Sequence, residues 1–464
     1  MPHKDRGIKP APIEIPNHTL SETRFSPTSF LPDVNEMAFE DESGMEESQR
    51  ISREIDERIL ESKRALDKKK KSVQILLLGQ SESGKSSVLK NFLLTFAPKQ
   101  FHRERAIWKT VIQLNLIGSI KKLLEILQEE WETVDVDSPP QPNNNLRRIR
   151  LGLTPLLFIE TNIMKLISPD TRFSHDLCVR SGGDWKATLM AHASIPQPSS
   201  PVDRKRTSHR DHGNKPIDPT SVLAASKDDI IVLWKDQSVR NLLSRRGVRM
   251  EEMSGFFLND IDRIASAHYE PTNADIVRAR IRTLGVEEHH FVIEKGIDKG
   301  IEVYITDVGG SQTQRARWIP YFEDVQTILF LAPLAFNQML EEDQNVNRVE
   351  DSLMLWKEIC RTKLLAKAVI LLFFNKRDVL QATLAAGVQV KRYVPSYGDL
   401  PNEITHVTKY FSDKFKGYHR KLSPLTRPFL CHETSAIDTE SMESLLMGVR
   451  ETILRINLQE GILL

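Results

Sequence analysis

The sequence of 464 residues contains only three cysteines, Cys178, Cys360 and Cys431, and they lie far apart. They form neither a zinc-binding spacing nor a disulfide framework, which favours a reducing compartment. No apolar run is long enough to cross a bilayer, and the first residues lack the apolar core of a signal peptide. The formal net charge is only +1, so the charge balance does not direct the chain to nucleic acid. We expect a cytoplasmic protein with no nucleic-acid partner.

The N-terminal segment also lacks a recognisable lipidation signal. Pro2, and not glycine, follows Met1, and no cysteine lies nearby. Residues 1–47 are rich in proline and predict a disordered arm, whereas residues 48–71 predict a charged N-terminal helix. That helix ends in the basic run Lys68–Lys71. The run is typical of a solvated helix end that complements the helix dipole, and the alternative is a membrane-surface patch.

The segment Ile75–Ser87, ILLLGQSESGKSS, organises the rest of the chain. Gly79 and Gly84 are separated by four residues and followed by Lys85 and Ser86, which is the pattern of a phosphate-binding loop. Val73–Leu78 predicts a buried strand before the loop, and Ser87–Phe96 predicts a helix after it. Backbone N–H groups and the helix N-terminus would bind the β-phosphate. Lys85 would reach the β- and γ-phosphates, and the Ser86 hydroxyl would ligate Mg²⁺.

Residues 100–270 predict an inserted all-helical domain with polar insertions near 132–150 and 190–228. Apolar residues at helical spacing indicate helices over Arg105–Leu127, Leu151–Ile167 and Asp228–Ile264. Between them, the tracts Ser138–Asn145 and Ser194–Asp218 are rich in polar residues and proline, which favours exposed loops.

Strand and helix patterns alternate again from about residue 290. This alternation predicts a doubly wound α/β sheet built from residues 72–99 and 271–464, with nucleotide at the carboxyl ends of its strands. The expected strands are Phe291–Glu294, Ile301–Thr306, Thr327–Leu334, Ala368–Phe374 and Arg427–Cys431, and the expected helices include Leu353–Cys360 and Thr439–Leu458.

Three further motifs follow expected strands and point to a guanine nucleotide. In Asp307–Gly310 (DVGG), the carboxylate could hold a Mg²⁺-bound water and the Gly310 N–H could meet the γ-phosphate. In Asn375–Asp378 (NKRD), the Asp378 carboxylate could accept two guanine N–H donors that adenine lacks. Asn375 would brace the loops and the Lys376 stem would cover the base. The Ala436 N–H, in the motif after the last strand, could donate to the guanine carbonyl.

The segment Asp275–Gly285, DIVRARIRTLG, adds the remaining chemistry. Thr283 could supply a second hydroxyl to Mg²⁺, and Arg280 could reach the γ-phosphate. Taken singly, these motifs have ordinary explanations: a turn, a polar strand end or a solvated helix face. Their joint occurrence in the correct order favours GTP binding.

The motifs resemble those of the α subunits of heterotrimeric G proteins. The resemblance runs through about Ser48–Leu127 and Ile230–Leu464. It includes the phosphate loop GQSESGKSS, the helical-domain segments LWKD and FLNDIDRIA, the first switch DIVRARIRTLG, the second switch DVGGSQTQRARWIPYFEDV, the third switch LEEDQNVNRVEDSL, and then NKRD, TSAIDT and the tail NLQEGILL.

The resemblance implies a Ras-like GTPase fold with an inserted all-helical domain, and a GTP-switched transducer that hydrolyses GTP to GDP. It implies βγ subunits, a membrane receptor, effectors and GTPase-activating proteins as partners, at the inner face of the plasma membrane. Arg280 would stabilise transition-state charge, with Ser311 and Gln312 at the position of the attacking water, and Ser86 and Thr283 would hold Mg²⁺. The implied GTP-binding residues are Gly79, Glu82, Ser83, Gly84, Lys85, Ser86, Ser87, Val277, Arg278, Arg280, Thr283, Asp307, Gly310, Asn375, Lys376, Asp378 and Ala436.

Two departures from the family pattern bear on hydrolysis. Ser311 stands where the family has the glutamine that orients water, and Ser81 stands where the family usually has a glycine. Gln312 could substitute only if the loop shifted. Slow GTP hydrolysis is therefore expected. The alternatives are a GTP-binding interaction module with negligible hydrolysis and an ATP-using kinase or ATPase, which Asp378 disfavours.

Overall fold

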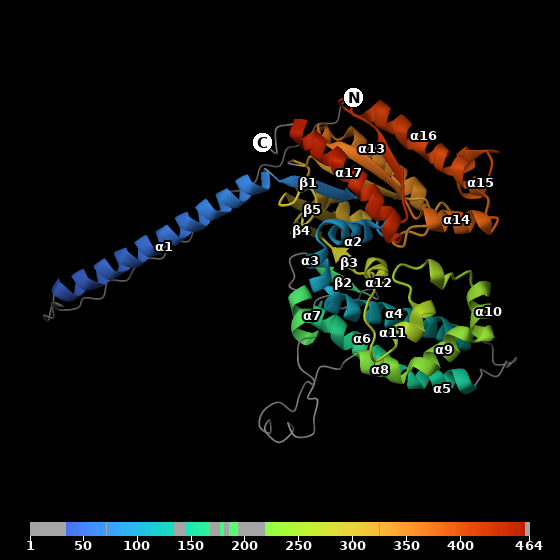
Figure 1. Cartoon of the computed structure of the whole chain (residues 1–464). Helices are drawn as coiled ribbons and strands as arrows, with labels where there is room; N and C mark the ends of the chain where they lie inside the picture. Colours follow the sequence, from blue (N-terminus) through green and yellow to red (C-terminus); the bar gives the residue numbers. More distant parts are fainter. Residues whose placement is uncertain are drawn as a thin grey trace, which may run out of the picture. The chain divides into compact units, whose positions relative to one another are not determined.

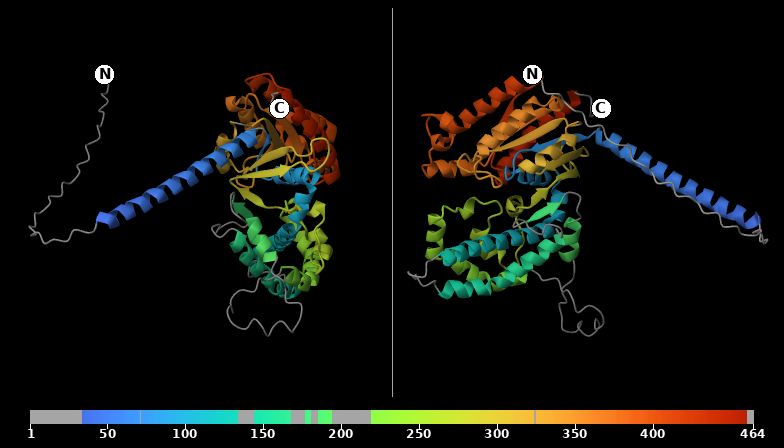
Figure 2. Two further views of the ribbon diagram at one scale, coloured as in Figure 1. Left: turned by 60° about the vertical axis from the view of Figure 1, so that its left-hand side comes forward. Right: turned by 180° about the vertical axis from the view of Figure 1, so that it is seen from behind.

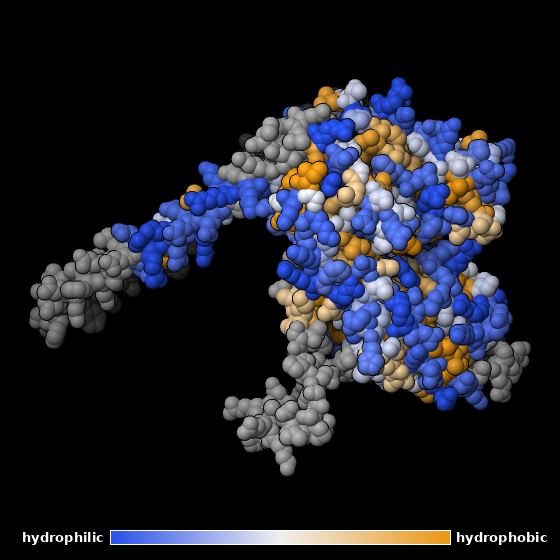
Figure 3. Space-filling view, viewed as in Figure 1, coloured by the Kyte–Doolittle hydropathy of each residue, from blue (hydrophilic) through white to orange (hydrophobic). Residues whose placement is uncertain are grey.

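The computed structural model describes residues 34–70, 72–133, 144–167, 177–180, 185–193, 219–323 and 325–459. The chain divides into two units, Met1–Leu66 and Asp67–Leu464. Along these described ranges, no helix has both the length and the apolarity needed to span a membrane. The face of the second unit seen in Figure 3 is mostly hydrophilic, with small hydrophobic areas between the polar ones.

The helix α1 spans Val34–Lys70 and begins well before the predicted residue 48. The sequence has no proline between Val34 and Lys70 to interrupt it. The earlier part of the predicted arm, up to residue 33, lies outside the described residues. At the other end of the helix, Lys68 pairs with Glu302 at 2.6 Å and Lys69 pairs with Glu288. Two lysines of the basic run therefore have protein carboxylates as partners, which weakens the alternative of a membrane-surface patch.

A six-stranded sheet forms the centre of the second unit, in the order β4-β5-β1-β6-β7-β8 (Figure 1). Five strands are parallel: β1 (Val73–Leu78), β5 (Glu302–Val308), β6 (Thr327–Pro333), β7 (Val369–Asn375) and β8 (Leu430–Glu433). The edge strand β4 (Val286–Val292) is antiparallel to β5. Every residue of β6 and β7 is buried, as expected for apolar runs covered on both faces.

Two strands begin several residues away from their predicted starts. The strand β4 begins at Val286 and not near Phe291. Its first half was missed because residues 287–290 are glutamate or histidine, which do not resemble a buried strand. The strand β8 begins at Leu430 and not at Arg427. Pro428 has no N–H for a ladder, and the Arg427 guanidinium donates to the backbone carbonyls of Cys360, Leu365 and Ala368.

Helices cover both faces of the sheet, which makes it doubly wound (Figures 1 and 2). Alternate residues of β1 enter different cores. Ile75 and Leu77 pack with α2 (Lys85–Phe96), α4 (Arg105–Thr133) and α17 (Thr439–Gln459), whereas Leu76 and Leu78 pack with α13 (Arg348–Arg361) and α16 (Ile404–Leu422). The smaller helices of this part are α3 (Pro98–Arg103), η4 (Gln312–Tyr321), η5 (Lys363–Leu365), α14 (Arg377–Ala385), α15 (Val390–Tyr393) and η6 (Pro395–Tyr397).

The segment between α3 and the first switch is a helical bundle. Its elements after α4 are α5 (Asn144–Gly152), α6 (Thr154–Ile167), α7 (Trp185–Ala193), α8 (Pro219–Ala225), α9 (Lys227–Lys235), α10 (Gln237–Arg245), η2 (Met250–Glu252), η3 (Leu258–Asp260), α11 (Ile261–Ile264) and α12 (Asn273–Arg278). Helix α5 occupies the end of the first predicted polar insertion. Residues 134–143 and 194–218, which make up most of the two predicted polar tracts, lie outside the described residues.

The bundle contains one strand, which corrects the prediction that residues 100–270 are all-helical. The strand β2 (Cys178–Arg180) pairs in parallel with β3 (Arg282–Leu284), and the Arg282 N–H donates to the Leu177 carbonyl at 2.8 Å. Val179 is fully buried and lies opposite Thr283 in this pairing. The first switch is therefore paired with a strand from the helical insertion.

Candidate nucleotide-binding site

A cavity of about 490 Å³ lies in the second unit, at the carboxyl ends of β1, β5 and β7. This is the position where open α/β sheets bind ligands. Segments far apart in sequence line it, namely residues 81–82 and 84–87 of the phosphate loop and α2, 251–256, 278–282, 307–311 with Gln314, 375–376 and 378–379, and 436–437. Of the predicted residues whose side chains the structure describes, Gly79, Ser83, Val277 and Gln312 are not part of this lining.

The phosphate loop is held by close backbone contacts. Gly84 has a φ of 101°, and a Cβ there would lie 2.1 Å from Asn375 Nδ2, so a larger residue does not fit. The buried Gln80 side chain donates to the Arg348 carbonyl at 2.7 Å, which ties the loop to α13. Helix α2 begins at Lys85, so its N-terminal N–H groups face the loop.

Two lysines line the cavity: Lys85 is buried, and Lys376 is half-buried. Lys85 Nζ donates to the carbonyls of Gly79 and Gln80, both at 2.9 Å. Burial lowers the pKa of Lys85 to about 8, and burial also lowers the pKa of Lys376 to about 8. A bound phosphate would favour the charged ammonium form of Lys85, because its negative charge would lie close to the buried ammonium group.

Ser86 and Asp307 provide an oxygen pair suited to a hard cation. Ser86 Oγ donates to Asp307 Oδ2 at 2.8 Å. Burial raises the pKa of Asp307, and its Oδ1 atom is buried with no hydrogen-bond partner among the described residues. Mg²⁺ is commonly bound by one or two protein oxygens together with substrate phosphates, and this pair fits that pattern. Thr283, the other predicted ligand, lies in β3, but its side chain lies outside what the structure describes.

Arg280 lines the cavity and is held there by Glu82. It forms an ion pair with one Glu82 oxygen, while Arg348 contacts the other at 2.6 Å. Burial raises the pKa of Glu82, but Arg280, Lys376 and Arg348 more than offset this effect, and the pKa falls to about 2. Glu82 therefore remains ionised at neutral pH and keeps the Arg280 guanidinium beside the phosphate loop.

The expected base-binding loops are joined by Asn375. Its Nδ2 donates to the Ser83 carbonyl at 2.7 Å, and its Oδ1 accepts from the Ala436 N–H at 2.9 Å. Asn375 thus braces three loops. The Ala436 N–H, predicted to donate to guanine, is already used in this bond. The Asp378 side chain lines the cavity and accepts from Ser435 Oγ at 2.7 Å.

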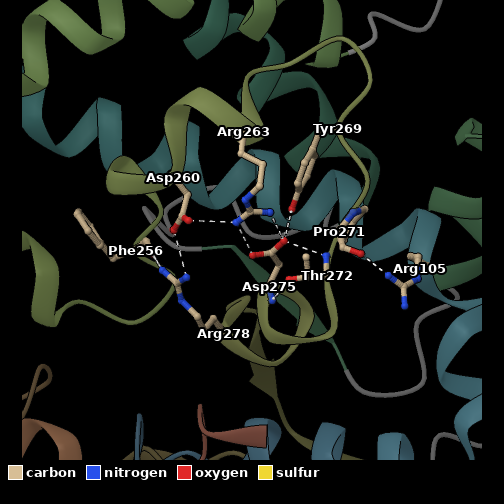
Figure 4. A network of polar contacts seen from close by, with 9 residues as sticks. All are labelled: Arg105, Phe256, Asp260, Arg263, Tyr269, Pro271, Thr272, Asp275 and Arg278. Atoms are coloured by element: carbon tan, nitrogen blue, oxygen red, sulfur yellow. Dashed lines mark hydrogen bonds and ion pairs between the residues drawn. The ribbon is translucent and has the colours of Figure 1, made fainter.

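A polar network holds the start of the first switch (Figure 4). The buried Asp275 carboxylate accepts from Arg263, from the Tyr269 hydroxyl at 3.1 Å and from the Thr272 N–H at 2.9 Å. Arg278, predicted to bind nucleotide, lines the cavity, but its guanidinium donates to Asp260 and to the Phe256 carbonyl (Figure 4). Its side chain therefore links the end of α12 to residues 256–260 of the helical bundle.

The remaining predicted residues lie in the phosphate loop or join α2 to the first switch. The Ser87 hydroxyl donates to the Val277 carbonyl at 3.1 Å, so both residues join the phosphate-loop helix to the first switch. The buried Ser83 side chain lies beneath the loop, and its hydroxyl has no partner among the described residues. Gly79 lies at the start of the loop, where a Cβ would come 2.5 Å from the Leu331 carbonyl oxygen.

The second switch begins where the cavity wall meets the phosphate loop. A Cβ at Gly310 would lie 2.4 Å from the Ser81 nitrogen, so this glycine permits contact with the phosphate loop. Ser311 is buried, and its hydroxyl is 3.4 Å from that of Thr313. Gln312 is exposed, and its Nε2 contacts Asp351 at 3.4 Å, outside the cavity lining.

Sequence reasoning missed two parts of the lining. Residues 251–256 reach the cavity from the helical insertion, and Gln314 reaches it from η4. The first contact is between segments far apart in the chain and leaves no local signal. The second could have been recognised from the spacing of a 3₁₀ helix, in which residues three apart share a face.

The fold and this cavity define a phosphate-loop nucleotide-binding protein with an inserted helical bundle. A family model described as "G-protein alpha subunit" matches residues 49–453. The chain is 29% identical to the guanine nucleotide-binding protein alpha-4 subunit of Mycosarcoma maydis, over 84% of each chain. It is 28% identical to the mouse subunit alpha-13, over 90% of this chain and 93% of the relative. It is also 34% identical to the human subunit alpha-12, over 49% of this chain and 58% of the relative.

This chain belongs to the G-protein α subunit family, whose members bind GTP and GDP, hydrolyse GTP and transduce signals. The resemblance drawn from the motifs is thereby confirmed, and so is the Ras-like GTPase fold with its helical domain. A catalytically silent interaction module is not favoured.

Proposed function

We propose that this protein is a Mg²⁺-dependent GTP switch whose intrinsic hydrolysis is slow. The observation that carries the proposal is the γ-phosphate end of the cavity, where Ser81 and Ser311 lie beside Gly310. Hydrolysis requires a water held in line with the γ-phosphate and stabilisation of the charge that develops in the transition state. Arg280 supplies the positive charge that stabilises the transition state. The Ser311 side chain, however, is too short to bind the water and a γ-phosphate oxygen at the same time.

Ser81 also slows GTP hydrolysis in this proposal. Its backbone nitrogen is in close contact with Gly310, so its side chain takes up space where the loop approaches the γ-phosphate. Bound Mg²⁺ would neutralise phosphate charge, and Ser86 and Asp307, with Thr283 of β3, are the residues that would hold it. Asp378 would select guanine by accepting its two N–H donors. These assignments give Arg280, Ser86 and Asp307 roles in catalysis. Ser81 and Ser311 slow hydrolysis and thereby make the GTP-bound state long-lived.

The family implies partners that this chain would share. We expect a βγ pair to bind α1 and the second switch in the GDP state, and a membrane receptor to bind the C-terminal segment. Helix α1 has exposed apolar residues at a four-residue spacing, Ile51, Ile55 and Ile59, which form one stripe suited to a protein partner. Effectors and GTPase-activating proteins would bind the GTP state, and the protein would act peripherally at the inner face of the plasma membrane.

The proposal is tested by single-turnover GTP hydrolysis on purified protein. We expect Ser311→Gln, Ser81→Gly and the double variant to hydrolyse faster than the wild type. The double variant should gain at least about tenfold, because misplacement of a reacting water costs a rate factor of this order or more. Ser244→Gln, on the exposed surface of α10, is the matched control and should not change the rate. If restoring both residues leaves the rate unchanged, slow turn-off does not arise from these positions.

A further inference from the structure

Gln314 lies on the cavity side of the second switch. The segment Gln312–Tyr321 is a 3₁₀ helix, and Ser311 is its N-cap. Side chains three residues apart in a 3₁₀ helix lie on the same face. Gln314 therefore shares a face with Ser311, whereas the Gln312 side chain is directed to Asp351. Gln314 thus lies one helical turn after Ser311.

The contacts of Gln314 place its carboxamide inside the site. A Cβ built on Gly309 would lie 1.5 Å from Gln314 Oε1, so the carboxamide rests directly against the Gly309 backbone. Gln314 lines the same cavity as Asp307, Gly310 and Arg280. Gln312 differs, because its Nε2 is directed to Asp351 on α13. Of the two glutamines, only Gln314 faces the γ-phosphate end.

The surrounding bonds hold Gln314 in this place. The Gln314 N–H donates to the Ser311 carbonyl at 2.9 Å, and Trp318 Nε1 donates to the Gly309 carbonyl at 2.9 Å. The next residue, Arg315, pairs with both oxygens of Asp351 at 2.9 and 2.5 Å. The helix is thus anchored on both sides of Gln314, and its carboxamide does not depend on a free loop for its direction.

From this geometry we infer that Gln314 is a catalytic residue that orients the attacking water, in place of the glutamine missing at position 311. The inference rests on the proposed hydrolytic function. The carboxamide oxygen accepts a hydrogen bond from water, and its NH₂ group donates to a γ-phosphate oxygen. The water oxygen bonds to the γ-phosphorus as the bond to the β–γ bridging oxygen breaks. GDP leaves with that oxygen, and the water proton passes to the released phosphate.

The test compares Gln314→Ala and Gln314→Glu with Gln312→Ala, the neighbouring glutamine outside the cavity, in single-turnover hydrolysis. We expect Gln314→Ala to lose at least about tenfold in rate, while Gln312→Ala stays within about twofold of the wild type. Gln314→Glu, which keeps the shape but loses the amide donor, should also be slow. Affinity for a non-hydrolysable GTP analogue and the melting temperature of the analogue-bound protein should stay unchanged. A purely structural role would alter both.

Two results would overturn the inference: a wild-type rate in Gln314→Ala, or an equal loss in Gln312→Ala. The Ser311→Gln variant separates this inference from the proposal of slow intrinsic hydrolysis. In that variant, the glutamine at position 311 should orient the water, so adding Gln314→Ala should lower the hydrolysis rate by less than about threefold. Failure of Ser311→Gln to raise the rate contradicts slow turn-off through Ser311, whereas the effect of Gln314→Ala in the otherwise wild-type chain decides the role of Gln314.

Discussion

The Ser86 hydroxyl donates to Asp307 Oδ2 over 2.8 Å, which connects the first turn of α2 with the end of β5. The other Asp307 oxygen is buried and has no partner among the described residues. A buried carboxylate oxygen without a partner is costly, and a metal-bound water would satisfy it. This relationship underlies the first prediction.

Ser86→Asn should weaken Mg²⁺ binding in the GTP state more than in the GDP state. The γ-phosphate provides an additional oxygen ligand in the GTP complex, so loss of the Ser86 hydroxyl disturbs a more complete coordination shell. Mg²⁺ titrations of the protein loaded with a GTP analogue and with GDP measure the two affinities. Ser244→Asn, on exposed α10, is the control. Equal Mg²⁺ affinity in Ser86→Asn and wild type would remove Ser86 from the metal site.

Asp378→Asn should weaken GTP binding and improve binding of xanthosine triphosphate. The lost interaction is a charge-assisted hydrogen bond, for which we expect a cost of about 1.5–3 kcal/mol. Competition binding with the two nucleotides reports the change in preference. Asp413→Asn, an exposed position on α16, provides the control for loss of one carboxylate. An unchanged nucleotide preference in Asp378→Asn would show that another group reads the base.

The pairing of β2 with β3 predicts that the helical insertion stabilises the first switch. Val179→Pro should disrupt this pairing, because proline lacks the N–H and is poorly tolerated inside a strand. We expect faster hydrogen exchange over Arg282–Leu284, measured by mass spectrometry with GDP bound. Val179→Ala retains the N–H and separates the effect of lost packing from that of lost pairing. Exchange in Val179→Pro no faster than in Val179→Ala would mean that the strand does not stabilise the switch.

Much of the fold was predictable from local patterns. The residues Val73–Leu78 are an uninterrupted apolar run before a glycine, and they form β1 with these limits. Thr439–Leu458 predicted the last helix, and α17 ends only one residue later. Such elements are visible in sequence because burial on both faces, or on one helical face, determines the residue types directly.

Elements that depend on distant partners were not predictable. The strand β2 has three residues, and its partner β3 lies about a hundred positions later, so nothing local marks it as a strand. The strand β4 is an edge strand with charged residues, whose pairing with β5 comes from tertiary hydrogen bonds and not from an apolar pattern. The helices α14 and α16, which follow the base-binding motif, were not predicted either.

The sequence by itself determined the phosphate loop, the order of the nucleotide motifs and the family, because these depend on residue types at short spacings. The tertiary structure alone decided which side chains face the cavity. It directs Arg278 toward Asp260, uses the Ala436 N–H within the Asn375 bridge, and turns Gln314 rather than Gln312 toward Gly309. The physical reason is that a side chain's direction follows from the helix turn and the packed neighbours around it, and those neighbours come from remote parts of the chain.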